Sequence, residues 1–538
     1  TQTNFELLHL FSAMRNLLII SVFLNFSTSF KFLAYSPIFA KSHVNFMAKI
    51  TDVLVDAGHE VVMLSEVYDT HLGGSMTNKA RVIEIPQTER AKEFEKWINN
   101  DVAVDFWADK SLYSIFSSFG GVVDVYADTC IATLTTPGLL DALRAEKFDA
   151  AYVESFHGCA PIVFHLLGID KFAMTESLAM NDAWFHYTQT PSNPSYVPSM
   201  MFAPAGENMT FFERVHNTYV FALNQHFTSK NMARFEEIVR ERFPHLPPFS
   251  DLTARNSLVF TNSEPLVDFP RPTTARMVEI GGIVVSSKHE PVNKTWSTIL
   301  DLRPRTIFLS FGSVAKAHLM PEEYKRSIVE VIKRFPDVTF IWKYERPDHN
   351  ISRGIDNLIE STWVPQRDLL HDPRLTAFIT HCGQGSTTEA IDAGIPLVVI
   401  PVLADQYRNA RQVVRNGIGL MLEKSQLSTP DALEAAIREI LSNNKYRERA
   451  YQVRKMINER PFPMKEVFIR NMEFLAAHGT LRQLDHYGRH LNFVQYFLID
   501  VFSFVSIGAL FLVCIMLLIF RSVVLVLSGA IRIKAKVE

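Results

Sequence analysis

The sequence is poor in cysteine and in clustered positive charge, and both absences exclude classes of protein. Its 538 residues include four cysteines, with no CxxC spacing: Cys130, Cys159, Cys382 and Cys514. This spacing indicates neither a disulfide framework nor a zinc site, although it leaves a single disulfide open. The formal net charge is −3 and no long basic block occurs, which argues against nucleic-acid binding.

Two nucleotide-binding motifs are also missing. The chain has no P-loop sequence, and the G-x-G formed by Gly383 and Gly385 lacks a third glycine at the right spacing. These absences disfavour a P-loop enzyme and a NAD-dependent oxidoreductase.

The sequence is instead long and apolar. With 47% hydrophobic residues, 538 residues are enough for two packed domains. In both halves, apolar runs of strand length alternate with stretches of helical periodicity, which predicts parallel sheets. The strand-like runs are 31–37, 60–64, 148–155, 306–313, 338–344, 375–381 and 396–402. We predict two tandem doubly wound α/β domains that face each other across a cleft.

The domain boundaries follow from where this alternation weakens. We predict an N-terminal domain over 30–267, a proline-rich linker over 268–303 and a C-terminal domain over 304–450. We expect further helices over 451–497, which lead to a predicted membrane-spanning segment. Within the first domain, 174–249 is rich in proline and aromatic residues, and we expect part of a substrate site there.

Both ends of the chain resemble targeting segments. Residues 1–29 look like a secretory signal, with an apolar stretch at 17–26 after Met14 and Arg15. Residues 501–520 carry no charge, and we predict a transmembrane helix over 498–521. The basic residues that follow place a tail, 522–538, in the cytosol and the body in the lumen, as a single-pass type I protein: Arg521, Arg532, Lys534 and Lys536.

Two short motifs agree with that location. The last residues, KAKVE, resemble a dilysine signal for retrieval to the endoplasmic reticulum. An ordinary basic segment beside a membrane helix is the alternative interpretation. Sequons at Asn208, Asn293 and Asn350 are compatible with a lumenal body.

The turn that follows the strand-like run at 375–381 has the features of an anion site. Backbone N–H groups near Gly383 and Gly385 precede a helix, where unpaired amides favour a phosphate, and His381 lies beside them. Two residues of this turn also have a purely structural explanation. Ser386 and Glu389 are spaced as a capping box, which would stabilise the helix with no ligand present.

These residues carry a specific resemblance. The segment 378–406 is similar to the signature of the UDP-glycosyltransferases, and the chain from about Lys31 to Glu538 resembles a membrane-anchored animal UDP-glucuronosyltransferase. The resemblance implies the GT-B fold, with two Rossmann-like domains. In that fold the C-terminal domain binds the nucleotide sugar and the N-terminal domain binds the acceptor.

The resemblance also implies roles for the donor-site residues. Trp363 would stack on uracil, with Gln366 bonding in the same region, and Glu389 would accept hydrogen bonds from the ribose hydroxyls. The diphosphate would lie against Gly312, Ser313, His381, Gly383, Gly385 and Ser386. Asp405 and Gln406 would bind the transferred sugar. Trp363 taken by itself would more simply be a core aromatic.

No Asp-x-Asp motif occurs, so the resemblance does not extend to metal-dependent nucleotide-sugar enzymes, and we expect neither a metal nor a bound cofactor. One departure concerns the sugar. Gly385-Ser386 stands where vertebrate members usually have Asn-Gly, which puts donor choice in doubt.

The resemblance makes His43 the catalytic base, since a histidine with a pKa near neutrality suits removal of an acceptor proton. Its carboxylate partner would be Glu154, in the stretch FDAAYVES, where the family usually has an aspartate. If the backbone does not accommodate the extra methylene, the chain is a weak or inactive member.

We therefore expect an inverting transfer of a sugar from a UDP-sugar, UDP-glucuronate first, to a small lipophilic acceptor. UDP-glucose is the alternative donor, and a non-catalytic partner of active members is the alternative role. Aromatic residues of the acceptor half suit apolar acceptors in a general way: Phe202, Phe211, Phe212 and Tyr219. The sequence leaves open whether the chain forms homo- or hetero-oligomers.

Overall fold

The computed structural model describes residues 29–156, 158–285 and 289–537, so the predicted signal segment lies outside the described residues except for Ser29. The chain divides into two compact units, one ending at Leu484 and the other beginning at Asp485.

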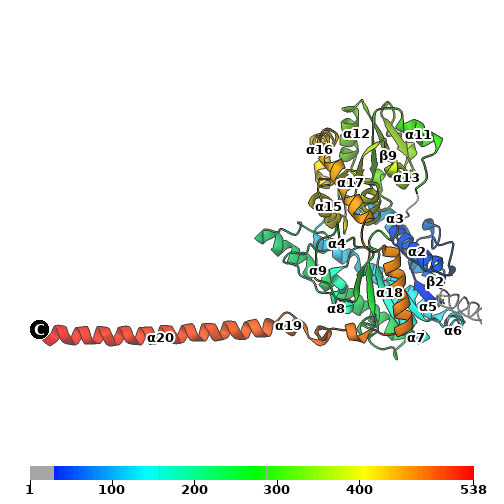
Figure 1. Ribbon diagram of the computed structural model, residues 1–538. Coiled ribbons are helices and arrows are strands. Elements are labelled where there is room, and N and C mark those ends of the chain that lie inside the picture. Colours follow the sequence, from blue (N-terminus) through cyan, green and yellow to red (C-terminus); the bar gives the residue numbers. More distant parts are fainter. Residues whose placement is uncertain (1–28, 157, 286–288, 538) are drawn as a thin grey trace, which may run out of the picture. The chain divides into compact units, whose positions relative to one another are not determined.

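The first unit contains two sheets of parallel strands, as the alternation of runs predicts (Figure 1). The first sheet has the order β3-β2-β1-β4-β5-β6-β7. Its strands are β1 (Lys31–Tyr35), β2 (Glu60–Glu66), β3 (Arg81–Ile85), β4 (Ala150–Glu154), β5 (Phe172–Glu176), β6 (Leu258–Thr261) and β7 (Met277–Glu279). The strand order reverses between β1 and β4, which leaves a crevice at their carboxyl ends.

The second sheet repeats this arrangement with the order β10-β9-β8-β11-β12-β13. Its strands are β8 (Arg305–Ser310), β9 (Val338–Lys343), β10 (Leu358–Ser361), β11 (Leu375–Thr380), β12 (Leu397–Val399) and β13 (Gly419–Met421). Here the order reverses between β8 and β11.

Helices cover both faces of each sheet, so the strands are apolar on both sides rather than alternating. In β1, for example, Phe32 and Ala34 pack into one core and Leu33 and Tyr35 into the core on the opposite face. The helices of the N-terminal half are α2 (Lys41–Asp56), α3 (Glu89–Asp105), α4 (Leu112–Ser118), α5 (Gly120–Thr135), α6 (Leu139–Ala145), α7 (Cys159–Leu167), α8 (Phe185–Thr188), α9 (Phe211–Arg242) and α10 (Phe249–Thr253).

The remaining helices belong to the C-terminal half and to the second unit. They are α11 (Lys294–Leu300), α12 (Glu322–Lys333), α13 (Gln366–His371), α14 (Gln384–Ala393), α15 (Gln406–Arg415), α16 (Pro430–Ser442), α17 (Lys445–Asn458), α18 (Met464–His478), α19 (Phe493–Tyr496) and α20 (Ile499–Val537).

The linker boundary predicted from the sequence needs correction. The range 268–303 contains β7, which pairs with β6 in parallel, so the first sheet extends to Glu279. The range also contains α11, whose Trp296 and Leu300 pack in a core of the second domain. The connection between the two sheets is therefore shorter than its proline content suggested.

The chain returns to the first domain after completing the second. Helix α18 packs Phe468, Met472 and Leu475 into the core that contains Phe32 of β1, and Figure 1 shows it beside α2. Between α17 and α18, Arg460 forms an ion pair with Glu264 at 2.6 Å and donates a hydrogen bond to the Gly281 carbonyl. The hydrogen bond from Arg460 to Gly281 thus joins the two segments that connect the domains.

A second set of contacts between the domains comes from α15. Three arginines on this helix reach the segment 198–207 of the first domain: Arg408 bonds the Pro198 carbonyl, Arg411 the Pro204 carbonyl and Arg415 the Glu207 carboxylate. In the same region, the Phe202 N–H donates to the Ala404 carbonyl at 2.9 Å. Segment 198–207 is therefore held along α15, from Ala404 before its start to Arg415 at its end.

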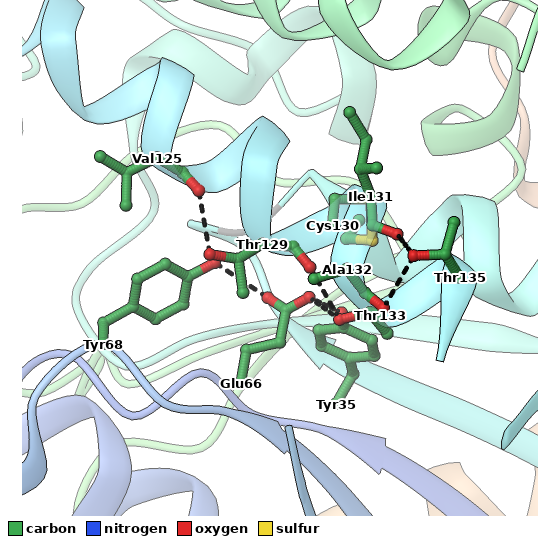
Figure 2. Close-up of a disulfide and its surroundings, with 11 residues drawn as sticks. Tyr35, Glu66, Tyr68, Val125, Thr129, Cys130, Ile131, Ala132, Thr133 and Thr135 are labelled. Carbon is green, nitrogen blue, oxygen red and sulfur yellow. Dashed lines mark hydrogen bonds between the residues drawn. A yellow bond between two sulfur atoms is a disulfide. The ribbon is translucent and has the colours of Figure 1, made fainter. Parts of the chain in front are cut away.

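A disulfide joins Cys130 of α5 to Cys159 of α7, which settles the pairing that the spacing left open. Beside it, the hydroxyls of Tyr35, Tyr68 and Thr133 all donate to the buried Glu66 carboxylate at the end of β2 (Figure 2). Three donors offset the cost of burying this charged group. The disulfide and this cluster together fix α5 on the sheet.

Two described segments are long and apolar enough to cross a membrane. Ile499–Ile531 of α20 has a mean hydropathy of 3.0, whereas Leu112–Thr135, which is α4 and α5, reaches 1.2. The second segment belongs to the folded domain, because Cys130 and Thr133 tie it to α7 and β2. The length and apolar surface of α20 fit a membrane anchor.

We expect the double variant Cys130→Ala/Cys159→Ala to unfold at lower denaturant concentration than the wild type. The bond closes a loop between residues 29 apart in sequence, and its loss should cost about 3–4 kcal/mol of unfolding free energy through chain entropy. Urea titration of the detergent-solubilised protein measures this, with Cys514→Ala in α20 as control. Equal midpoints for the double variant and the control would show that the disulfide adds no stability.

Candidate functional site

At the crevice of the second sheet, one side chain packs closely against two glycines. The His381 ring, at the end of β11, lies between the backbones of Gly312 and Gly383, and a Cβ added at either glycine would come within 2.6 Å of it. Burial, reinforced by the charge of Lys343, lowers the pKa of His381 to about 4. At neutral pH the ring is therefore uncharged, with one nitrogen able to donate and the other to accept.

Helix α14 begins at this turn, and its start differs from the sequence expectation. Its N-cap is Gly383, with no side-chain cap, so the capping box of Ser386 and Glu389 is wrong. The glycine lets the helix begin at Gln384, and this moves Ser386 into the first turn. The N–H groups of Gln384, Gly385 and Ser386 are therefore at the open end of the helix, where an anion is stabilised.

Ser386 and Glu389 instead share a side-chain partner. Gln366, the first residue of α13, donates through Nε2 to Glu389 Oε2 at 2.6 Å and to Ser386 Oγ at 3.1 Å. Burial raises the pKa of Glu389. The three residues form one polar group at the mouth of the crevice.

Trp363 stands next to this group and is not a core residue. Its side chain is 64% exposed, which removes the core-aromatic interpretation. Gly312, which has a φ of +82°, turns the chain after β8, and Ser313 beyond it is exposed. A flat face and several donors therefore surround the start of α14.

Lys343 at the end of β9 is a neighbour that sequence reasoning missed. Its Nζ donates to the Gly312 carbonyl at 2.7 Å and pairs with Glu345 at 3.1 Å. A cation here stabilises negative charge at the glycine turn. No motif marks it, because a lysine at the end of an apolar strand is ordinary in sequence.

Asp405 and Gln406 begin α15 beyond β12. Asn409 donates to Asp405 Oδ2 at 2.8 Å, and Gln406 Oε1 accepts from the N–H groups of Val402 and Leu403. The Gln406 amide nitrogen has no hydrogen bond to a described residue. Burial raises the pKa of Asp405 to about 6, while the hydrogen bond from Asn409 opposes the rise.

The crevice of the first sheet holds the other half of the site. His43, in the first turn of α2, lies 3.0 Å through Nδ1 from Glu154 Oε1 at the end of β4. Glu154 thus reaches the ring despite its extra methylene. Nε2 of His43 has no hydrogen bond to a described residue, so it is free to face a ligand.

Ser177, directly after β5, completes this group and was not predicted. Its Oγ lies 2.6 Å from His43 Nδ1 and donates to Glu154 Oε1 at 3.0 Å. Glu154 and Ser177 together hold the proton of His43 on Nδ1, so that Nε2 is the basic nitrogen. A serine after an apolar strand gives no sequence signal for this role.

Aromatic rings wall His43 on two sides. Phe39 and Phe156 have ring centroids 4.9 and 5.0 Å from the imidazole. Hydrogen bonds join the crevices of the two sheets: Gln384 Nε2 of α14 donates to the Asn262 carbonyl at 3.0 Å, and Asn262 Nδ2 donates to the Ser177 carbonyl at 2.9 Å.

A cavity of about 540 Å³ lies between the domains, and Val402 and Leu403, which precede α15, line it, whereas His43, Glu154 and Ser177 do not. Its apolar wall includes Trp97, Phe106, Phe119, Phe202, Leu403 and Tyr407. Of the four aromatic residues singled out in the sequence, Phe202 lines the cavity, whereas Phe211, Phe212 and Tyr219 are exposed on α9. The volume suits a small organic molecule.

The chain matches a known family along nearly its whole length. Residues 34–537 fit the family model described as "UDP-glucoronosyl and UDP-glucosyl transferase". A putative UDP-glucuronosyltransferase of Caenorhabditis elegans, ugt-48, is 29% identical over 88% of this chain and 91% of its own length. UDP-glucuronosyltransferase 1-2 of Mus musculus is 25% identical over 83% of both chains.

Solved structures confirm the architecture. A UDP-glucosyltransferase from Polygonum tinctorium, capable of glucosylating indoxyl, superimposes with a TM-score of 0.56 at 14% identity, over 84% of this chain and 99% of its own. The fold is GT-B, as predicted.

We expect Gly383→Ala to weaken UDP binding by about tenfold or more, or roughly 1.4 kcal/mol, because the new methyl displaces the His381 ring. The control is Gly120→Ala in α5, where an added Cβ meets no atom within 4 Å. Calorimetric titration with UDP compares the two variants. Equal affinities would show that the glycine–histidine contact does not shape the binding site.

Proposed function

The chain belongs to the UDP-glucoronosyl and UDP-glucosyl transferase family and is a UDP-glycosyltransferase, and we propose that it transfers glucuronate from UDP-glucuronate to a hydroxyl of a small lipophilic acceptor. We propose inversion at the anomeric carbon, which gives a β-glycoside from an α-linked donor. The hydrogen-bonded group of His43, Glu154 and Ser177 is the observation that carries this proposal.

The donor would be held by the second domain. Uracil would stack on the exposed Trp363, with Gln366 beside it, and Glu389 would accept from the ribose hydroxyls. The diphosphate would accept hydrogen bonds from Ser313 and from the open start of α14, at Gly385 and Ser386. Asp405 and the free amide nitrogen of Gln406 would bind hydroxyls of the sugar.

The preference for glucuronate rests on the names of the curated relatives, which are UDP-glucuronosyltransferases. UDP-glucose is the alternative donor within the same family. This alternative stays open because Gly385-Ser386 stands where vertebrate members usually have Asn-Gly. The acceptor would occupy the cavity lined by Trp97, Phe202 and Tyr407, whose apolar wall favours lipophilic molecules.

The transfer would need one base. His43 Nε2 would take the acceptor proton as the acceptor oxygen attacks the anomeric carbon on the face opposite UDP. The bond from that carbon to the phosphate oxygen would break, and UDP would leave with the electron pair. Glu154 would stabilise the imidazolium, and Ser177 would help to keep the ring oriented. The contact of Glu154 with His43 argues against the second candidate, a non-catalytic partner.

For localisation we propose the endoplasmic reticulum membrane, with the body in the lumen and α20 as a single span. Two observations support a lumenal body. The Cys130–Cys159 disulfide requires an oxidising compartment, and the sequon residues Asn208, Asn293 and Asn350 are all exposed. The basic residues that follow the span favour a cytosolic tail.

Membranes that carry the protein should form product from a mixed phenol and alcohol panel with UDP-glucuronate and should lose it with His43→Ala. Removal of a general base lowers the rate by about 10²- to 10⁴-fold. Mass spectrometry of the products with UDP-glucuronate or UDP-glucose identifies the sugar. Product from UDP-glucose alone would replace the donor assignment, and UDP binding without product from either donor would favour the non-catalytic partner.

We also expect donor binding to weaken in acid. Asp405 accepts sugar hydroxyls best when ionised, and with its pKa raised to about 6 it is ionised at pH 7.5 and mostly protonated at pH 5. The affinity for the UDP-sugar should then fall about tenfold relative to that for UDP between these pH values. Titration of both ligands against wild type and Asp405→Asn measures this. A ratio that stays constant in the wild type would exclude Asp405 as a sugar ligand.

A further inference from the structure

The first domain has a second hollow, of about 360 Å³, on the side of α3 that faces α4 and α5. Phe94 and Trp97 of α3 line it opposite Ser118, Gly121, Val122 and Val125. Its floor is apolar, because Phe94 and Val125 are buried residues of the underlying core. Its rim carries the charged residues Arg90, Glu93 and Asp124. We refer to this hollow as the outer groove.

The outer groove and the cavity between the domains share part of their walls. Trp97 and Ser118 line both spaces. The two hollows therefore lie on either side of the same two residues, and the Ser118 side chain is small. Trp97 is the larger barrier between them.

The Trp97 side chain is held in place by packing alone. It makes no hydrogen bond to any described residue, it is only partly buried, and its ring packs at a tilt on Phe94 with centroids 5.8 Å apart. Such a side chain changes rotamer without breaking a polar contact. Its own cluster includes Phe39, whose ring lies against His43.

We propose that the outer groove is the entrance through which the lipophilic acceptor reaches the cavity, with Trp97 as the gate between them. This proposal rests on the acceptor site proposed above. The apolar floor and charged rim of the groove match a lipophilic molecule that has a polar end. The groove is formed wholly by the first domain, whereas the donor site is formed by the second. An acceptor could thus enter while the donor is bound.

The chain offers a matched pair of variants to test this. Gly120 and Gly121 are neighbours in α5, and an added Cβ meets no atom within 4 Å at either position, but only Gly121 lines the groove. Gly121→Phe fills the groove, and Gly120→Phe is its control. Phenol, 1-naphthol and a four-ring steroid phenol form an acceptor series of increasing size.

We expect Gly121→Phe to lower kcat/KM for the steroid phenol by about tenfold and for phenol by less than about twofold, since obstructed access slows association of large ligands most. Gly120→Phe should match the wild type throughout. Trp97→Ala should raise kcat/KM for the steroid phenol relative to phenol, and Trp97→Phe should fall between it and the wild type. The KM for the UDP-sugar should not change in any of these variants.

Stopped-flow binding of fluorescent 1-naphthol without donor separates this proposal from the proposed function. If the wild type binds 1-naphthol but forms no product, the proposed function fails, and the entrance is judged by association rates. Slower association in Gly121→Phe than in Gly120→Phe supports the entrance. Equal association rates, or equal kcat/KM across the acceptor series for these two variants, would overturn it.

Discussion

The site depends on one topological constraint that occurs twice. In a parallel doubly wound sheet, the crossovers leave a crevice only where the strand order reverses, between β1 and β4 in the first domain and between β8 and β11 in the second. His43 and Glu154 lie at the first crevice, and Gly312 and His381 lie at the second. The fold itself therefore provides the positions for the residues proposed to bind the UDP-sugar and the acceptor molecule. These residues occupy the two positions that the fold keeps open, and the hydrogen bonds from Gln384 to Asn262 and from Asn262 to Ser177 join the two positions.

The two crevices surround their histidines with groups of opposite charge. At the crevice of the second sheet, burial and Lys343 keep His381 uncharged. The ring can therefore form a hydrogen bond with a ligand without itself attracting a counterion. At the first, the Glu154 carboxylate faces His43 directly, which favours the imidazolium that forms when a proton is taken. One histidine is thus suited to hold a ligand and the other to accept charge. The difference comes from what surrounds each ring and not from the residue type.

Sequence reasoning predicted the elements well and the local contacts less well. Strands such as β1 and β8 were predicted because burial on both faces leaves long apolar runs. The capping box was wrong because Gly383 starts α14 earlier than a side-chain cap would. Ser177 was missed because its role depends on β4 and β5 being neighbours, which no local pattern encodes. The partners of α18 and of Cys130 were missed for the same reason, since each lies far away in sequence.

The path of the chain between the domains has a mechanical consequence. The second domain is connected to the first twice, by the segment after β7 and by the segment between α17 and α18. Arg460 of the second connection bonds Gly281 of the first connection and Glu264 in the loop before β7. Two adjacent attachments resist twisting and leave bending about the line through them as the easiest relative motion. Bending about that line would also break the hydrogen bonds from α15 to segment 198–207, so these bonds oppose separation of His43 from Asp405.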